Sequence, residues 1–341
     1  WSCQPKSQPA VTLDSPSKKV NVTFGLTPSG QPYYTSSFEG SSVVDTSYLG
    51  FELDDEVSLK SGFSLESSSQ TSFDETWEQP WGEQRLIRNN YNELTVNLKT
   101  AEGYLLNVVF RAFDDGVGFR YEFPEQEKLG EFQVLDEVTE FNLSNDQSAW
   151  WIPAYEGNRY EYEFTKSKVS DLNLVHTPLT LEGETFVAIH EAALYDYPSM
   201  VLKGTGSSKL VCDLVPYSTT DPVKAYVQAP FATPWRTIQL GKQAGDLITN
   251  YMILNLNEPN RLGDVSWVQP GKYIGVWWEM FINLGTWHQG PKHAANTKNV
   301  KKYIDFAAEN GFKGVLVEGW NEGWDGPWMN GGTKFDFTKP Y

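Results

Sequence analysis

The hydrophobic pattern of the chain changes period once, near residue 260, and this change constrains the fold more than any other feature. Before it, apolar and polar residues alternate in short segments such as 92–98, 106–113 and 119–123. Alternation of this kind places one face of a strand against a core and the other in water. Turn signals such as Asp114-Asp115-Gly116 separate the segments, and no amphipathic helical pattern interrupts them. We therefore predict a large antiparallel β-sandwich for this part of the chain.

After Pro259 the pattern becomes that of an α/β unit. Residues 273–278 form a continuous apolar run, which is typical of a strand buried on both faces. Segment 296–310 predicts a helix, with one of its first two polar residues as N-cap and Gly311 as its stop. A second apolar strand follows at 314–320, so these elements form one right-handed, parallel βαβ unit.

One βαβ unit cannot bury both faces of its own sheet. A (β/α)8 barrel takes about 250 residues, whereas only a short segment follows the second predicted strand. We therefore expect residues 267–341 to be the truncated start of such a barrel, and residues 20–266 to be the sandwich domain. Residues 1–19 are expected to be a flexible N-terminus that remains after signal-peptide or lipoprotein processing.

The two cysteines, Cys3 and Cys212, allow at most one disulfide and cannot form a zinc site by themselves. Cys3 is also a candidate for lipidation, with an unpaired cysteine in a frayed terminus as the alternative. The four histidines are scattered without an HExxH pair, so we expect any bound ion to be hard and oxygen-ligated.

The charge of the chain argues against two classes of partner. It has 44 acidic and 27 basic residues, a formal net charge of −17, and no basic stripe. Nucleic acids and anionic membrane surfaces both favour clustered lysine and arginine, so neither is expected as a partner. No apolar run reaches the roughly 18 residues of a membrane-spanning helix, so no transmembrane segment is predicted.

Aromatic and carboxylate side chains gather where the two strands of the βαβ unit end. Trp277, Trp278 and Glu279 end the first predicted strand, and residues 318–324 follow the second. Active sites of parallel α/β barrels lie at these strand ends, and tryptophan beside carboxylate and amide groups is typical of a sugar-binding platform. Because strand residues alternate faces, a place in the barrel core is the simpler alternative for one of the first two tryptophans.

We predict that Trp320 and Asn321, in the loop after the second strand, bind substrate together with Glu318. Glycoside hydrolysis needs two carboxylates, about 5–5.5 Å apart for retention or 6.5–9.5 Å for inversion. The βαβ unit offers Glu318 no convincing partner, since Glu322 could equally be solvated. Glu318 is therefore not assigned a catalytic role.

A second cluster, residues 150–163, combines five aromatic rings with three glutamates. On a strand, Glu161 and Glu163 would share one face, where like charges repel unless a cation neutralises them. A calcium site is one solution, because Ca²⁺ takes 6–8 oxygen ligands. A solvated strand face with screened charges is the other, and composition alone favours it.

Several blocks of the sequence together carry a family resemblance. In chain order they are Phe73–Trp77, Trp81–Glu83, Arg88–Leu94, Phe113–Tyr121, Trp151–Pro153, His190–Leu194, Thr233–Thr237, Leu254–Pro259, Tyr273–Trp278 and Val317–Trp324. From about residue 20 to the end, the chain closely resembles glycoside hydrolase family 97. The resemblance implies a galactose-mutarotase-like β-supersandwich, followed by the opening of a catalytic (β/α)8 barrel.

The resemblance also implies an activity: a calcium-dependent, exo-acting α-glycosidase of the periplasm or outer membrane. The blocks look closer to the α-glucosidase branch, which acts on maltooligosaccharides, than to the α-galactosidase branch. The family's catalytic carboxylates and its other calcium ligands are expected beyond Tyr341. The chain by itself is therefore expected to be inactive.

The resemblance further implies one metal ligand within the chain. In the family a calcium-ligating glutamate follows the Trp-Ile-Pro block, and its segment is similar to Glu161–Thr165 after a one-residue insertion. This match implies Glu161 as the ligand, with Glu163 and Glu156 as alternatives. The resemblance thus favours a calcium site at residues 150–163 over the alternative of a solvated strand face with screened charges.

Two other classes remain as alternatives. One is a non-catalytic carbohydrate-binding sandwich, which would have no reason to carry the start of a Trp-rich barrel. The other is an aldose mutarotase, which shares the supersandwich but would need a His–Glu pair, here His176 or His190 with Glu191.

Overall fold

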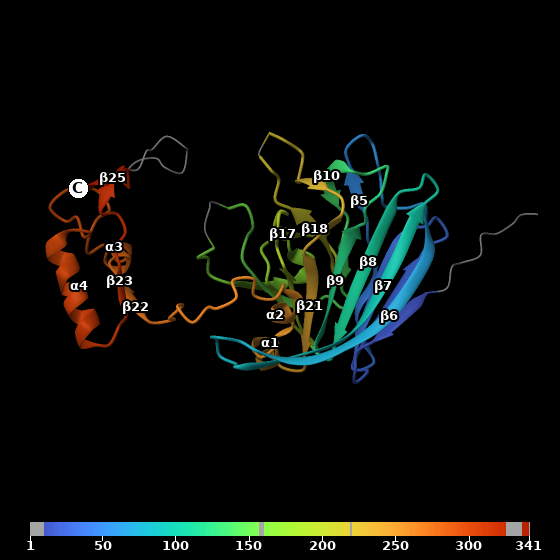
Figure 1. Ribbon diagram of the computed structural model, residues 1–341, viewed down its shortest axis with the longest axis horizontal. Helices are drawn as coiled ribbons and strands as arrows, with labels where there is room; N and C mark the ends of the chain where they lie inside the picture. The colour runs from blue at the N-terminus through green and yellow to red at the C-terminus, as the bar shows by residue number, and fades with distance from the viewer. Residues whose placement is uncertain (1–9, 157–159, 219, 325–335, 341) are drawn as a thin grey trace, which may run out of the picture. The chain divides into compact units, whose positions relative to one another are not determined.

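The computed structural model describes residues 10–156, 160–218, 220–324 and 336–340. The chain divides into two compact units, Trp1–Asn260 and Arg261–Tyr341. The first unit consists mainly of antiparallel strands, which confirms the predicted all-β sandwich (Figure 1). The division at Asn260 lies a few residues before the expected boundary at 266.

The largest sheet of the first unit has the order β13-β12-β15-β16-β21-β9-β8-β7-β6, with β20 paired to β9. Its long strands β6 to β9 run side by side in Figure 1. The predicted strands at 92–98, 106–113 and 119–123 lie within β7, β8 and β9. The bounds are β6 Phe63–Glu78, β7 Leu86–Thr100, β8 Leu105–Phe113, β9 Gly116–Phe123, β12 Ser148–Trp151, β13 Thr165–Lys168, β15 Leu179–Glu182, β16 Phe186–Ala192, β20 Phe231–Ala232 and β21 Trp235–Gly241.

Three smaller sheets complete this unit, with the orders β1-β2-β3-β4, β11-β18-β17-β14 and β19-β10-β5. Strand β1 pairs with β2 from Val11 onward, so regular structure is present before residue 20, the expected start of the sandwich domain. The bounds are β1 Val11–Asp14, β2 Val20–Leu26, β3 Pro32–Phe38, β4 Ser41–Tyr48, β5 Phe51–Leu53, β10 Glu131–Glu137, β11 Glu140–Asn142, β14 Leu174–Val175, β17 Met200–Gly204, β18 Lys209–Leu214 and β19 Ala225–Gln228, with a 3₁₀ turn, η1, at Val169–Asp171.

The main core contains the inward side chains of all four sheets. Phe110 and Phe119 of the large sheet contact Phe24 and Tyr34, with ring centroids 6.1 Å apart for Phe24–Phe110 and 4.9 Å for Tyr34–Phe119. These residues are almost fully buried, as the alternating pattern of their strands predicts.

Two short helices, α1 at Ala244–Ile248 and α2 at Met252–Leu256, follow the last strand of the first unit. The sequence pattern predicts no helix in this part of the chain, and this prediction is wrong for these two elements. Met252 and Leu256 join Trp235, Tyr91 and Phe113 in a second apolar cluster. Helix α2 is therefore stabilised by packing on the large sheet.

The second unit contains the predicted βαβ arrangement. Strands β22 (Tyr273–Gly275) and β23 (Gly314–Leu316) pair in parallel, and helix α4 (Thr297–Glu309) connects them. The side chain of Asn296 caps α4 by accepting a hydrogen bond from the amide of Asn299 at 3.0 Å. Helix α3 spans Trp277–Phe281, and β24 (Asn321–Glu322) pairs antiparallel with β25 (Asp336–Pro340).

The predicted strands of this unit were too long, and their burial on both faces was wrong. The first ends at Gly275, where the chain turns into α3, and the second ends at Leu316. Tyr273 is 64% exposed and Leu316 43% exposed. The described part of this unit has one two-stranded parallel sheet and a small apolar cluster built on Val276, Met280 and Ala294. Among the described residues, no helix is long and apolar enough to cross a membrane.

Candidate functional site

The predicted substrate-binding residues lie in the turn that follows β23. Gly319 has a positive φ of 72°, and a Cβ at this position would come within 2.6 Å of the Trp287 ring. The turn backbone therefore packs directly on an indole, which only glycine permits. Glu318 and Trp320, on either side, are half-buried, whereas Asn321 is 1% exposed.

The buried amide of Asn321 positions a pair of indoles. Its Oδ1 accepts a hydrogen bond from Trp324 Nε1 at 2.9 Å, and its Nδ2 donates to the Glu322 carbonyl at 3.2 Å. Trp324 stacks on Trp287 with ring centroids 5.4 Å apart and planes 11° from parallel. Asn321 thus orders an aromatic pair, and direct contact of its side chain with substrate stays a prediction.

Trp320 faces a different environment. With Val317, Pro340 and seven residues between Ala295 and Ile304, it lines a hollow of about 610 Å³. Glu318 and Asn321 do not line this hollow. Of the three predicted substrate-binding residues, only Trp320 lines this hollow.

The aromatic residues after β22 are exposed. Trp277 and Trp278 both stack on Phe281 within α3, at centroid distances of 4.8 and 5.2 Å. Neither indole is buried in the described structure. Glu279 points to α4, where its Oε2 accepts hydrogen bonds from Asn299 Nδ2 at 2.5 Å and from the Tyr303 hydroxyl at 3.1 Å.

The predicted calcium ligand lies in irregular structure. Residues 160–164 form no strand, so the shared strand face considered for Glu161 and Glu163 does not exist. Both side chains are exposed, and neither carboxylate has a hydrogen bond or ion pair with a described residue. Within the described residues, no group of three or more potential ligands is close enough to hold a metal. An accessible, unpaired carboxylate suits a calcium ligand, but supplies only part of the 6–8 oxygens.

Trp150, in the same sequence cluster, forms a small polar and aromatic platform. Its Nε1 donates to Glu182 Oε2 at 2.9 Å, and the same oxygen pairs with Lys166 Nζ at 2.7 Å. The ammonium lies 5.0 Å from the Trp150 ring, within cation–π range. The hydrogen bond from Lys166 is the main cause that lowers the pKa of Glu182.

A fully buried charge cluster, which sequence reasoning missed, lies inside the sandwich. Arg236 donates to both oxygens of Glu137 at 2.8 and 2.6 Å, and to Glu191 Oε2 at 2.7 Å. Burial lowers the pKa of Arg236, but the charge of Glu137 outweighs this, so the guanidinium stays charged. Burial raises the pKa of Glu191.

This cluster removes the His–Glu pair that a mutarotase would need. Glu191 is occupied by Arg236 and by the Met200 amide. His190 lies on the opposite face of β16, where its Nδ1 is 3.0 Å from the Thr177 hydroxyl. The ring of His176 instead packs against Tyr160 at a centroid distance of 4.4 Å.

Two family models match this chain. Residues 13–259 match Glycosyl-hydrolase 97 N-terminal, and residues 277–341 match Glycoside hydrolase 97. The chain belongs to glycoside hydrolase family 97. The first match covers the sandwich just described, and the second covers α3, α4 and the Trp287–Trp324 pair.

Solved structures and curated relatives agree with this assignment. A family 97 enzyme from Pseudoalteromonas sp. strain K8, solved with acarbose and also with panose, is 46% identical to this chain with a TM-score of 0.91. The match covers 97% of this chain and 50% of that one. A retaining α-galactosidase from Bacteroides thetaiotaomicron is 28% identical over 94% of this chain and 51% of its own length, and a probable retaining α-galactosidase from Streptomyces bingchenggensis is 26% identical over 82% and 42%. The chain thus spans about half the length of these relatives.

Several blocks that carry the family 97 resemblance meet where α2 packs on the large sheet. A Cβ on Gly118 would lie 2.6 Å from a methyl carbon of Leu256, so the helix rests on the bare backbone of β9. The side chain of Asn255 accepts from Trp77 Nε1 and donates to the Arg88 carbonyl, each at 2.9 Å. These blocks therefore fix the segment with which the first unit ends.

Proposed function

We propose that the full-length protein is an exo-acting α-glycoside hydrolase with α-glucosidase specificity for maltooligosaccharides. The observation that carries this proposal is the likeness to the Pseudoalteromonas enzyme, at 46% identity over nearly the whole chain. That enzyme was solved with acarbose and panose, and panose is a trisaccharide of α-linked glucose. The catalytic carboxylates are expected in the part of the relatives that this chain does not span.

The residues of this chain would bind and orient the sugar. Trp320 offers a half-exposed indole on which a pyranose ring can stack, and Glu318 offers acceptors for hydroxyl groups. Asn321 would act indirectly, by fixing the indole of Trp324.

We further propose that Glu161 contributes a ligand to a calcium ion. Its exposed, unpaired carboxylate supports this role, and the remaining ligands would come from outside the described residues. Bound calcium would supply positive charge that polarises the substrate or a water molecule. The task of Glu161 is to hold that charge in place.

A second candidate is α-galactosidase activity. It is favoured by the Bacteroides relative, which is named a retaining α-galactosidase and is 28% identical over 94% of this chain. We propose glucosidase activity first because the Pseudoalteromonas enzyme, solved with acarbose and with panose, has the higher identity to this chain.

The deciding experiment is hydrolysis of p-nitrophenyl α-glucoside and α-galactoside by the full-length gene product, with and without EDTA. We expect release of p-nitrophenol from the glucoside. EDTA should abolish this release, and added calcium should restore it. Release from the galactoside alone would replace the proposed specificity by the second candidate. The absence of activity on both would favour a non-catalytic carbohydrate-binding protein.

We also propose a periplasmic or outer-membrane location, with Cys3 as the lipidated residue. Cys3 lies outside the described residues, so the support is the sequence pattern alone. Incorporation of labelled palmitate that Cys3→Ser abolishes is the expected result. Labelling that survives this substitution would exclude Cys3.

A further inference from the structure

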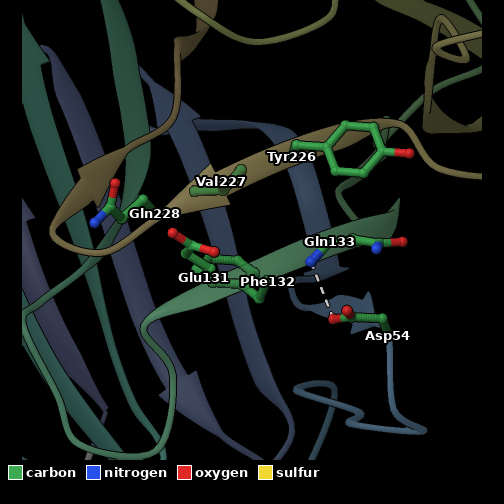
Figure 2. A pocket seen from close by; sticks show the side chains of 7 residues that line it. All are labelled: Asp54, Glu131, Phe132, Gln133, Tyr226, Val227 and Gln228. Carbon is green, nitrogen blue, oxygen red and sulfur yellow. Dashed lines mark hydrogen bonds between the residues drawn. The ribbon is translucent and has the colours of Figure 1, made fainter.

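A hollow of about 410 Å³ lies on the outer face of the three-stranded sheet β19-β10-β5 (Figure 2). This volume is within the range of about 300–1,000 Å³ that is common for small-molecule sites. No block of the family 97 resemblance includes the residues that line it. They are Asp54, Glu131, Phe132, Gln133, Tyr226, Val227 and Gln228.

The strand register explains how these residues come together. Glu131 is paired with Gln228, and Gln133 with Tyr226, across the antiparallel strands β10 and β19. Because side chains alternate along a strand, these four lie on one face, and their neighbours Phe132 and Val227 are buried on the other. The outer face thus presents two adjacent cross-strand pairs, both polar or aromatic.

Most hydrogen-bonding groups of the hollow have no partner in the described structure. The side chains of Glu131, Gln133 and Gln228 make no hydrogen bond or ion pair with a described residue. The Asp54 carboxylate accepts one hydrogen bond, from the backbone N–H of Gln133 at 3.0 Å, as Figure 2 shows. Carboxylate oxygens that can accept hydrogen bonds, and side-chain amides that can donate and accept them, therefore remain for a ligand.

Tyr226 supplies a fixed aromatic surface at one end of the hollow. The residue is 54% exposed. Its hydroxyl is 3.0 Å from Asp221 Oδ2, and its ring packs edge-on against Tyr217 at a centroid distance of 5.3 Å and 83°. These two contacts hold the ring in one orientation, so that its exposed face is ordered before any ligand binds.

The chemistry of the lining selects among ligands. It contains two carboxylates and two amides, and no lysine, arginine or histidine. An anionic ligand such as a phosphate or an acidic sugar would be repelled. A neutral polyhydroxyl ligand fits, because a pyranose ring stacks on an aromatic face while amides and carboxylates bind its hydroxyl groups.

We propose that this hollow binds a neutral oligosaccharide, with Tyr226 as the stacking ring and Gln133 and Glu131 as hydrogen-bonding groups. The proposal rests on the proposed function only for the choice of sugar, an α-linked glucose oligomer. Such a site would keep the protein bound to an oligomeric or polymeric substrate, because its weak binding adds to that of the active site.

Isothermal titration calorimetry tests the proposal. It measures the dissociation constant of maltohexaose for the 341-residue chain, at millimolar sugar concentrations. Tyr226→Ala should weaken binding about ten-fold, since it removes the stacking surface. The matched control is Tyr195→Ala, because Tyr195 is exposed to 53% and lies outside the hollow. Gln133→Ala, which leaves the aromatic pair intact, should also weaken binding, and thermal unfolding checks that each variant is folded.

Equal binding by Tyr226→Ala and Tyr195→Ala, or no binding of either maltohexaose or raffinose, would overturn the proposal. Binding of raffinose in place of maltohexaose, still dependent on Tyr226, would keep the site and change its sugar. Hydrolysis by the full-length protein is read separately. Glucosidase activity without Tyr226-dependent binding overturns this inference alone, whereas Tyr226-dependent binding without hydrolysis overturns the proposed activity alone.

Discussion

Asp114 and Asp115 are adjacent at the turn between β8 and β9, yet the structure shifts the pKa values of their carboxyls in opposite directions. Burial raises the pKa of Asp114, but hydrogen bonds from the Ser17 amide at 2.9 Å and the Ser15 hydroxyl at 2.7 Å outweigh it. The net pKa of Asp114 lies below its usual value. Burial raises the pKa of Asp115 to about 6, with the neighbouring Asp114 charge as a smaller cause.

Asp115→Asn should therefore stabilise the protein at high pH. With a folded pKa of about 6 against 3.8 for the free group, the contribution of Asp115 to stability is complete below about pH 4. It is lost as the pH rises through 6, and the shift corresponds to about 3 kcal/mol. The variant should match the wild type at pH 4 and exceed its free energy of unfolding at pH 8 by up to that amount. Urea unfolding at both pH values measures the difference.

Asp114→Asn is the matched comparison and should behave in the opposite way. A depressed pKa means that the charged form is the stabilised one, so this contribution is present at neutral pH and lost as the pH falls through the folded pKa. The variant should be less stable than the wild type at pH 7, with the difference shrinking in acid. Two parallel pH profiles would show that the turn does not distinguish the two carboxyls.

Arg236→Met should unfold or severely destabilise the sandwich. Arg236 is 0% exposed and forms ion pairs with both Glu137 and Glu191, so its loss leaves buried carboxylates unpaired. Breaking a buried pair in this way costs about 3–5 kcal/mol. Arg85→Met is the control, because Arg85 pairs with Glu78 at the surface and its loss should leave urea unfolding unchanged. A small effect at Arg236 would mean that water reaches the cluster.

Gly118→Ala should displace α2 from the sheet. The added Cβ would lie 2.6 Å from a Leu256 methyl carbon, and overpacking of this kind costs about 1–3 kcal/mol. Leu256→Ala leaves room for the added methyl group. The double variant should therefore lose less free energy of unfolding than the sum of the losses in the two single variants. Gly130→Ala, where a Cβ meets nothing within 4 Å, is the control. Strict additivity would contradict the close contact.

The strands could be predicted because their signal is local. Alternation in 92–98 reports one wet and one buried face, and the structure places this segment within β7. The cap of α4 is equally local, since a polar side chain such as Asn296 can satisfy the first free amides of a helix. Helices α1 and α2 could not be found, because five residues are too few for a helical period.

The site was harder to predict because its parts depend on long-range packing. The pattern around Asn321 suggested a ligand contact, but nothing local showed that its amide would be used by Trp324. The apolar run that contains Trp277 and Trp278 predicts burial, but it does not show which residues would cover the two indoles. In the structure both indoles are exposed. The block Thr233–Thr237 carries Arg236 as part of the family resemblance, but only the fold brings Glu137 and Glu191 to this side chain.

The calcium proposal predicts a specific effect of Glu161→Gln in the full-length protein. Removing one ligand charge from a calcium site lowers its affinity, and we expect a loss of at least about ten-fold. The measurement is calcium titration of the EDTA-treated protein by calorimetry, which does not depend on activity. Glu163→Gln is the matched control, because Glu163 is equally exposed, lies two residues away, and should leave the affinity unchanged. A larger loss with Glu163→Gln would transfer the ligand role to that residue, and no loss with either would remove this loop from the site.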